Sequence, residues 1–494
     1  MNWKVILRSF GHQDMRKRIF VVLGILLVFR ILAHIPVPLS DPQTLQQVLE
    51  NLFAAENTPQ FLSLVNVLSG GALAQFSIMI AGLGPYINAS IIMQLLTKAV
   101  PKLEALQKEG EYGQRKINQM TRMLTLPLAI LQSIGAIYLV RQVAQSVGGI
   151  GDITADASMF QWVLMVAALT GGSMLLMWLG EQITEQSVGN GISLLITVGI
   201  VSSLPGMVGT LWGNVFDGSH WSFLGWWVPV NQSGMFFALG MIVAILVATW
   251  IVVMLNEAAR RLTINYAKRV QGNRTYGGVT TVLPIKLITA GVIPIIFAVA
   301  FLSVPPFVGQ LLTGSESARL QEIGANMMAW FQAPNSATFA AGGWEPYIYP
   351  FAYFMLVFLF TFFYTSITFN SKEIAENLQK QGGFIEGVRS GQQTEKYLSR
   401  TVNRLTLFGA TSLGLLASVP IIIQAFVSTS IALEGTSILI LVAVSLETLR
   451  AVESRALMVT YDQYSDPNFF QDMEQEVKSP KKRLFSRLPF RRKK

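Results

Sequence analysis

Long apolar windows alternate along the chain with shorter polar connections. A bilayer core about 30 Å thick is crossed by roughly 20 mostly apolar helical residues, and continuous runs of this kind exclude an outer-membrane barrel, whose strands alternate over about ten residues. The pattern therefore predicts an all-α polytopic membrane protein with about ten transmembrane helices. The windows cover residues 19–38, 76–97, 122–140, 159–180, 190–205, 234–255, 284–307, 347–369, 404–424 and 435–451, of which 190–205 and 435–451 are shorter.

Lysine and arginine concentrate in alternate connections between these windows. The leader and the second, sixth and eighth connections are basic, whereas residues 39–75, 206–233 and 425–434 contain no Lys or Arg. Positively charged connections stay on the cytoplasmic side of a membrane. The alternation supports ten spans and predicts that both termini are cytoplasmic, although the connection 181–190 carries Glu181 and no base.

Composition supports the membrane class and excludes several kinds of chemistry. Of the 494 residues, 51% are hydrophobic and 13% are charged, whereas an ordinary soluble protein has about 25% charged residues. The chain has no Cys, which excludes disulfides and thiolate metal sites. It also lacks a phosphate-binding loop of the Gly-x-x-x-x-Gly-Lys type and a His-Glu-x-x-His motif. We therefore expect no cofactor, no metal and no ATP hydrolysis, so that a partner or the membrane potential must supply energy.

Ionisable residues are scarce within the apolar windows. Arg30 lies in the outer half of the first window, and Glu447 and Arg450 lie near the inner end of the last. Such groups often mark an ion pathway or a proton relay, but these three are interpreted first as interfacial side chains or as local pairs at helix ends. Their scarcity disfavours a carrier driven by protons or sodium.

An apolar stretch at residues 61–75 precedes the second window. At about 1.5 Å per helical residue it is too short to cross the bilayer. Gly70 and Gly71 interrupt it before the full window begins at Phe76. A re-entrant turn at the interface and a movable stopper both fit this pattern.

Two connections and the tail combine many bases with little apolar content. The sixth and eighth connections contain helix-compatible stretches at Ala258–Ala267 and Ile374–Gln381. They fit either a solvated cytoplasmic face or a dock for a large acidic partner. The tail ending in Lys478–Lys494 fits contact with anionic lipid or with the phosphates of ribosomal RNA.

Short strings over residues 15–465 carry a resemblance to a known family. In chain order they are VFR at 28–30, IPVP at 35–38, SGGAL at 69–73, PYINASII at 85–92, KEGE at 108–111, MWLGEQIT at 177–184, GNGIS at 189–193, NYAKR at 265–269, AGVIP at 290–294 and GQQT at 391–394. In these strings the sequence resembles the SecY family, the central channel subunits of bacterial protein translocases. The resemblance implies two pseudo-symmetric halves of five helices, 1–205 and 206–460, around an hourglass pore, followed by a basic tail at 461–494.

The resemblance also implies where the pore is narrowest and what closes it. The constriction would be a ring of bulky aliphatic side chains, which excludes ions by dewetting and has no charge to hold a passing polypeptide. Residues of about 61–72 would be the plug, which favours the stopper interpretation. Carried over by motif position, the ring consists of Leu83, Ile87, Ile192, Ile196, Ile296 and Ile440, and the plug includes Leu62, Leu64, Val65, Val67, Leu68, Gly70 and Gly71.

A lateral exit toward lipid would lie between the second and seventh helices, flanked by the third and eighth. Asn88 and Gln94 on the second helix and Thr289 on the seventh would set how hydrophobic an entering signal helix must be. Each of these side chains could equally make an ordinary hydrogen bond between helices.

The resemblance implies that connections 256–285 and 370–403 bind the ribosome and the motor ATPase SecA. The small subunits SecE and SecG, anionic lipids, and nascent secretory and membrane proteins are the other implied partners, and the bacterial plasma membrane is the implied location. Arg389 is the strongest single docking candidate. The full set is Arg260, Arg261, Lys268, Arg269, Arg274, Arg389 and Lys396.

Two other classes of protein are alternatives. A secondary carrier for small solutes would need convergent polar ligands at the midplane, and an insertase without a full pore would need a hydrophilic groove within the membrane. The ring positions are all aliphatic, and the windows contain no such groove. The leading hypothesis is a passive, gated conduit that translocates unfolded polypeptides and releases membrane helices into lipid.

Overall fold

The structure is a computed structural model of the 494-residue chain. It describes residues 13–37, 77–146, 158–216, 221–223, 226–228, 231–266, 269–271, 274–276, 278, 280–313, 317–331, 334, 338–339, 343–423 and 435–464.

Each apolar window overlaps a helix of the structure. Five helical stretches of the described residues, beginning at Glu111, Met159, Gln232, Glu345 and Gln392, are long and apolar enough to cross a membrane. The helices that overlap the windows are α2 (Gln13–Leu32), α5 (Gly84–Ala99), α7 (Glu111–Ser146), α8 (Met159–Glu185), α9 (Gly191–Val215), α10 (Gln232–Glu257), α11 (Ile293–Leu302), α15 (Ile348–Thr368), α17 (Gln392–Ile423) and α19 (Gly435–Tyr464).

The two shorter windows form longer helices than the apolar pattern predicted. Helix α9 has 25 residues and α19 has 30. The Asn190 side chain accepts a hydrogen bond from the Ile192 amide and so caps the start of α9. Pro205 lies inside α9 without ending it. Polar residues therefore shortened these two windows in the sequence without interrupting the helices.

The window 284–307 contains three elements instead of one helix. Its first residues belong to β6 (Thr280–Lys286), α11 begins only at Ile293, and α12 (Val304–Thr313) follows one residue after α11 ends. Gly291 has a φ of 61°, which glycine adopts without steric cost. Pro294 then lies in the first turn of α11, where its missing N–H leaves no intrahelical bond unmade.

The sixth connection forms a β-sheet, so the helix-compatible interpretation of Ala258–Ala267 was wrong. Strand β3 (Ala259–Tyr266) pairs antiparallel with β6 on one side and with β7 (Gly383–Ile385) on the other. Alternate side chains, Leu262 and Ile264, are buried, as expected for a strand with one covered face. The stretch Ile374–Gln381 is helical as expected, in α16 (Ser371–Lys380).

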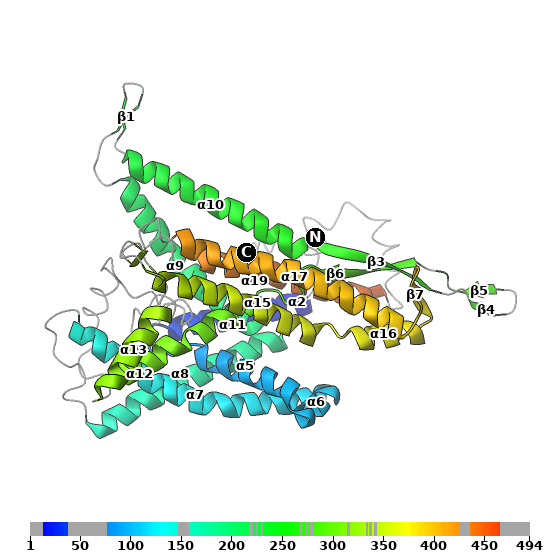
Figure 1. Ribbon diagram of the computed structural model, residues 1–494, viewed down its shortest axis with the longest axis horizontal. Coiled ribbons are helices and arrows are strands. Elements are labelled where there is room, and N and C mark those ends of the chain that lie inside the picture. Colours follow the sequence, from blue (N-terminus) through cyan, green and yellow to red (C-terminus); the bar gives the residue numbers. More distant parts are fainter. Residues whose placement is uncertain are drawn as a thin grey trace, which may run out of the picture.

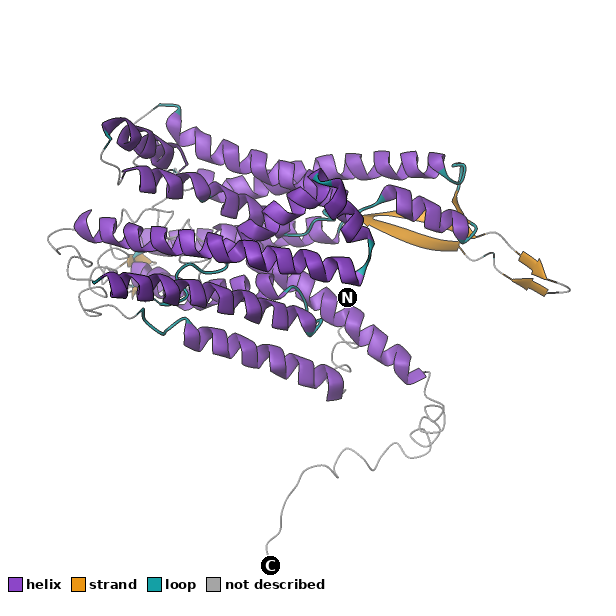
Figure 2. Cartoon of the chain, turned by 90° about the horizontal axis from the view of Figure 1, so that it is seen from below, coloured by secondary structure: helices purple, strands orange, loops and turns teal. Residues whose placement is uncertain are grey.

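The basic connections gather at one end of the bundle. Figure 1 shows the long helices lying along the long axis, with α6 (Pro101–Lys108), α16 and the β6–β3–β7 sheet at one end. The hairpin of β4 (Arg269–Gln271) and β5 (Arg274–Tyr276) projects beyond that end, as Figure 2 also shows. At the opposite end lie α12 and α13 (Ala318–Phe331) and the hairpin of β1 (Trp221–Phe223) and β2 (Trp226–Val228), while the short helix η1 (Glu345–Tyr347) leads into α15.

Candidate functional site

The six side chains assigned to the ring all belong to the hydrophobic core of the bundle or pack against it. Leu83 and Ile87 are each 2% exposed, Ile196 is 1%, Ile296 is 4% and Ile440 is 5%. These five residues belong to one contiguous hydrophobic core, and the partly buried Ile192 packs against it. We call the set Leu83, Ile87, Ile192, Ile196, Ile296 and Ile440 the aliphatic cluster. Its members come from the start of α5 and from α9, α11 and α19, so the fold brings together residues separated by up to 357 positions.

Helices α5 and α11 begin with the same spacing of glycine and proline. Two residues of the aliphatic cluster therefore occupy the same position relative to the start of their helices. Gly82 and Gly291 both have positive φ, at 57° and 61°. A proline follows each glycine after three residues and lies in the first helical turn. By this spacing Ile87 corresponds to Ile296 and Leu83 corresponds to Val292.

Val292 is a candidate that the sequence analysis missed. It is 2% exposed and belongs to the same hydrophobic core as the aliphatic cluster. The repeated Gly-x-x-Pro spacing within the second and seventh windows was the signal that could have identified it, because the same spacing gives Leu83 and Val292 the same place at the start of a helix.

Helix α9 reaches the cluster through close backbone packing on α8. A Cβ atom added to Gly191 would lie 1.9 Å from the carbonyl oxygen of Gly180, and one added to Gly180 would lie 3.4 Å from Cγ1 of Ile192. Only glycine allows helices to approach so closely. The string GNGIS therefore sets the position of the cluster residues on α9.

Contacts join the helices of the candidate lateral gate. Helix α5 contacts α11, and α7 contacts α12. At the second contact a Cβ atom added to Gly135 would lie 2.0 Å from the ring of Phe307, so the ring packs directly on the α7 backbone. The second and seventh helices of the sequence analysis therefore meet along one seam.

The three polar gate candidates differ in their contacts. Thr289 donates from Oγ1 to Oγ1 of Thr365 on α15 at 3.1 Å, so its bond joins two elements of the second half instead of crossing the seam. On α5, Gln94 donates to Oγ of Ser90 at 3.2 Å, and its Oε1 is buried without a partner among the described residues. Asn88 is half-buried on the same helix.

The sheet β6–β3–β7, which we call the docking sheet, brings bases of two connections together. Arg260 and Arg261 are exposed on β3, and Arg389 is exposed in the turn that follows β7. The Thr394 hydroxyl donates to the Arg389 carbonyl at 3.0 Å and fixes this turn against the start of α17. Lys396 is exposed on α17. The sixth and eighth connections, about 120 residues apart, thus form one basic surface.

The docking sheet has its own small hydrophobic core. Leu262, Ile264 and Ile285 pack with residues of α16 and α17 in a cluster separate from the bundle interior. Of the remaining docking candidates, Arg269 lies in β4 and Arg274 in β5, whereas Lys268 lies outside the described residues. The plug candidates at 61–72 and the tail 465–494 also lie outside them.

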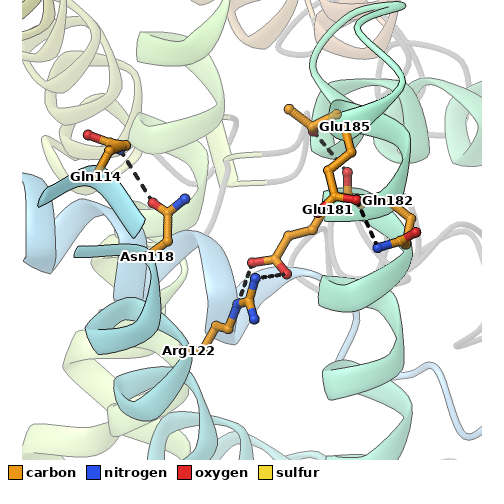
Figure 3. Close-up of polar contacts among 8 residues, drawn as sticks. Gln114, Asn118, Arg122, Glu181, Gln182 and Glu185 are labelled. Atoms are coloured by element: carbon orange, nitrogen blue, oxygen red, sulfur yellow. Dashed lines mark hydrogen bonds and ion pairs between the residues drawn. The ribbon is translucent and has the colours of Figure 1, made fainter. Parts of the chain in front are cut away.

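An ion pair joins α7 and α8 at the end of the bundle that carries α6. Arg122 donates from Nε to Oε1 of Glu181 at 2.8 Å, and its Nη2 lies 2.7 Å from Oε2 (Figure 3). Such a bidentate contact fixes geometry as well as charge. Glu181 was the acidic exception to the pattern of basic connections, and the structure places it directly against a base of the preceding connection.

The charged residue at the end of the last window also has a helix-end partner. Nη2 of Arg450 on α19 lies 2.5 Å from Oε1 of Glu257 and donates to the Asn256 carbonyl at 3.0 Å, both at the end of α10. The pairing expected for Arg450 is therefore present, although its partner comes from another helix.

These features define a polytopic helical membrane protein with buried aliphatic residues in its interior and a basic sheet at one end. The SecY family model matches residues 77–449. The chain is 40% identical over 461 residues to the protein translocase subunit SecY of Streptomyces galbus, covering 92% of this chain and 98% of that protein. The chain belongs to the SecY family and is a channel subunit of a protein translocase.

Solved structures share the fold at low sequence identity. One is described as showing that the plug domain of SecY stabilises the closed state of the translocation channel and maintains a membrane seal; its TM-score is 0.59 at 17% identity, over 88% of this chain and 90% of that one. Another is Sec61 in the canine ribosome–channel complex, with a TM-score of 0.55 at 15% identity, over 87% of this chain and 90% of that one. Both show that this chain has the fold of these channel proteins.

Proposed function

We propose that the aliphatic cluster is the constriction through which this channel passes unfolded polypeptides. The observation that carries the proposal is that six aliphatic side chains from four separate helical segments meet in one buried core. A narrow apolar ring holds no continuous water column and so resists ions. It also offers no fixed charge to which a polypeptide of arbitrary sequence would bind. Stiff β-branched isoleucine gives such a ring a defined diameter.

The plug is proposed to be the segment of about residues 61–72. The support is its short apolar sequence with Gly70 and Gly71 and the plug described for a SecY of the same fold. Deleting residues 62–72 is expected to raise the ion conductance of the resting channel in planar bilayers. Unchanged conductance would contradict this assignment.

The seam between α5 and α11 is the proposed exit toward lipid. Contacts between these helices and between α7 and α12 would part when a hydrophobic signal helix enters. Asn88 and Gln94 lie on α5, one of the two helices of this seam, and their polarity would favour the closed arrangement over lipid exposure. Thr289 would act more weakly, because its hydrogen bond stays with α15.

The docking sheet is proposed to bind the partners that supply energy. A ribosome-bound Sec61 has the same fold, and ribosomal RNA offers a dense array of phosphates to exposed arginine. Arg260, Arg261 and Arg389 would make this contact, with Lys268, Arg269, Arg274 and Lys396 around them. The motor ATPase SecA would use the same surface, and SecE and SecG would complete the complex. The membrane would be the bacterial plasma membrane, with both termini and the docking sheet on the cytoplasmic side.

Crosslinking of a stalled secretory chain tests the constriction. A photoreactive amino acid is placed at Ile87 or Ile440, and at Leu246 as a control, because Leu246 is 62% exposed on α10. A translocating chain held by a folded domain at its end should crosslink to the first two positions and not to the third. Equal crosslinking at Leu246, or none at Ile87 and Ile440, would refute the proposal.

A further inference from the structure

The last helix of the bundle contacts both the constriction and the base of the docking sheet. Helix α19 contributes Ile440 to the aliphatic cluster and, ten residues later, presents Arg450 to the end of α10. Strand β3 begins at Ala259, only two residues after Glu257. The guanidinium therefore holds the point where the sheet joins the bundle.

The contact at this junction is polar and partly shielded from water. Arg450 binds the carbonyl of Asn256 and the carboxylate of Glu257 at once, and its side chain is 29% exposed. The Leu287 amide donates to the Ala258 carbonyl at 2.8 Å, so the strand that leaves the bundle and the strand that returns are tied at the same level. Both bonds come from Nη2, whose two N–H groups can each donate to one of the oxygens.

Further charges surround the junction. Lys286 ends β6, and with Asn256, Glu447 and Arg450 it lines a cavity of about 250 Å³ between the docking sheet, α15 and α19. Burial lowers the pKa of the Lys286 ammonium, the positive charge of Arg450 lowers it further, and Glu257 and Glu447 act in the opposite direction. The positive charge of Arg450 therefore acts on Glu257, just before β3 begins, and on Lys286, where β6 ends.

We propose that Arg450 is a positioning residue that couples the docking sheet to the aliphatic cluster through α19. When a partner pulls or tilts the sheet, the junction at Asn256 and Glu257 moves, and the bound guanidinium carries α19 with it. Ile440 lies ten residues along the same helix, about 15 Å at 1.5 Å per residue. Movement of the sheet therefore shifts one side of the constriction. The functional part of this inference rests on the docking and constriction roles proposed above.

Distance measurements test the coupling without any partner. Because the chain has no Cys, spin labels can be placed at two exposed sites only, with Thr263→Cys on β3 and Ser445→Cys on α19. We expect a narrow distance distribution in the otherwise unchanged chain and a clearly broader one with Arg450→Ala. Charge reversal of both partners, Arg450→Glu with Glu257→Arg, should narrow the distribution again. A distribution that stays broad in the reversed pair would show that the ion pair between residues 450 and 257 does not fix this distance.

A functional measurement follows on the same variants. Reconstituted channels are mixed with ribosomes that carry no nascent chain, and ribosome affinity and ribosome-stimulated ion conductance are measured. Couplings between contacting residues are of order 0.5–3 kcal/mol, so Arg450→Ala should lower stimulated conductance about three- to tenfold. Ribosome affinity should change less than about twofold, since Arg450 lies below the exposed face of the sheet. Arg404→Ala is the matched control, an exposed arginine on α17.

The outcomes separate this inference from the proposed function. If the unchanged channel does not bind ribosomes, the docking role is wrong, and the distance measurement still decides the coupling. A distance distribution that stays narrow in Arg450→Ala overturns the coupling, as does stimulated conductance equal to that of the unchanged channel. Should Arg450→Ala fail to fold, Arg450→Lys keeps the charge on a shorter and more flexible side chain, and intermediate broadening is expected.

Discussion

The aliphatic cluster and the docking sheet use opposite physical means within one channel. The cluster is buried, carries no charge and is built from helices that are far apart in sequence. The docking sheet exposes Arg260 and Arg261 near the start of β3, and farther along the strand it buries Leu262 and Ile264 in a small core of its own. A passage for polypeptides of many sequences works best without a side chain that binds any one of them, whereas fixed charge improves the recognition of one acidic partner. Packing changes should therefore affect the first region and charge changes the second.

The largest effect is expected from crowding the helix that carries two cluster residues. In Gly191→Ala the new Cβ would lie 1.9 Å from the Gly180 carbonyl oxygen, which is backbone and cannot rotate away. Overpacking typically costs about 1–3 kcal/mol and occasionally more, and we expect a loss of about 3 kcal/mol here. The purified channel should show a clearly lower thermal unfolding temperature and raised resting conductance.

Gly206→Ala is the control for this substitution. It lies on the same helix, and its Cβ would have nothing within 4 Å. Equal unfolding temperatures for the two variants would mean that the α8–α9 contact does not position the cluster.

The next effect concerns packing beneath the docking sheet. Ile264 is 4% exposed and contacts the small core on α16 and α17. Truncating a buried isoleucine costs about 2–5 kcal/mol, and the lower end is expected because this core is small. Ile264→Ala should speed protease cleavage of connection 256–285 while resting conductance stays normal. Thr263→Ala, on the exposed face of the same strand, should leave cleavage unchanged; raised conductance in Ile264→Ala would show that the two regions are not separable.

How far the sequence predicts this structure differs between the two regions. The helices of the bundle follow from apolar windows, because burial in lipid or protein selects the same residues along a whole helix. The assignment of Ile87 or Ile440 to a ring came only from the family resemblance, since either residue alone looks like ordinary helix packing. Burial of these residues together is a property of the fold, while their role as a constriction stays a prediction.

The docking sheet was missed for a different reason. Leu262 and Ile264 alternate with polar residues as in a strand, but β3 is short and rich in residues that a helix also accepts. Its strand state depends on β6 and on β7, and the latter lies about 120 residues away in sequence. Pairing over such a separation cannot be read from a local pattern. The window 284–307 was misjudged likewise, because apolar residues continue from β6 through the connection 287–292 into α11.

A third prediction reverses one charge on the docking surface. Arg389 is exposed, and its carbonyl, not its side chain, accepts the bond from Thr394, so Arg389→Glu should leave the turn intact. An attraction becomes a repulsion, and we expect export of a secretory protein to fall about tenfold, which corresponds to about 1.4 kcal/mol. Membrane insertion of the channel and its unfolding temperature should not change.

Arg115→Glu provides the matched reversal. This arginine is also exposed at the same end of the bundle, but on α7. Normal export in Arg389→Glu, or an equal loss in Arg115→Glu, would remove the special role of the turn after β7.

The smallest effect is expected from removing two neighbouring charges and measuring salt dependence. Each arginine that contacts a phosphate releases counterions on binding, so log affinity falls with log salt by about one per contact. For Arg260→Ala with Arg261→Ala, the slope for ribosome binding should therefore decrease by about two, while affinity at high salt changes little. Thr263→Ala should keep the original slope. If the slope does not change in the double variant, the phosphate contacts lie elsewhere on the protein. Arg389 alone would then support the difference between a charged docking sheet and an uncharged aliphatic cluster.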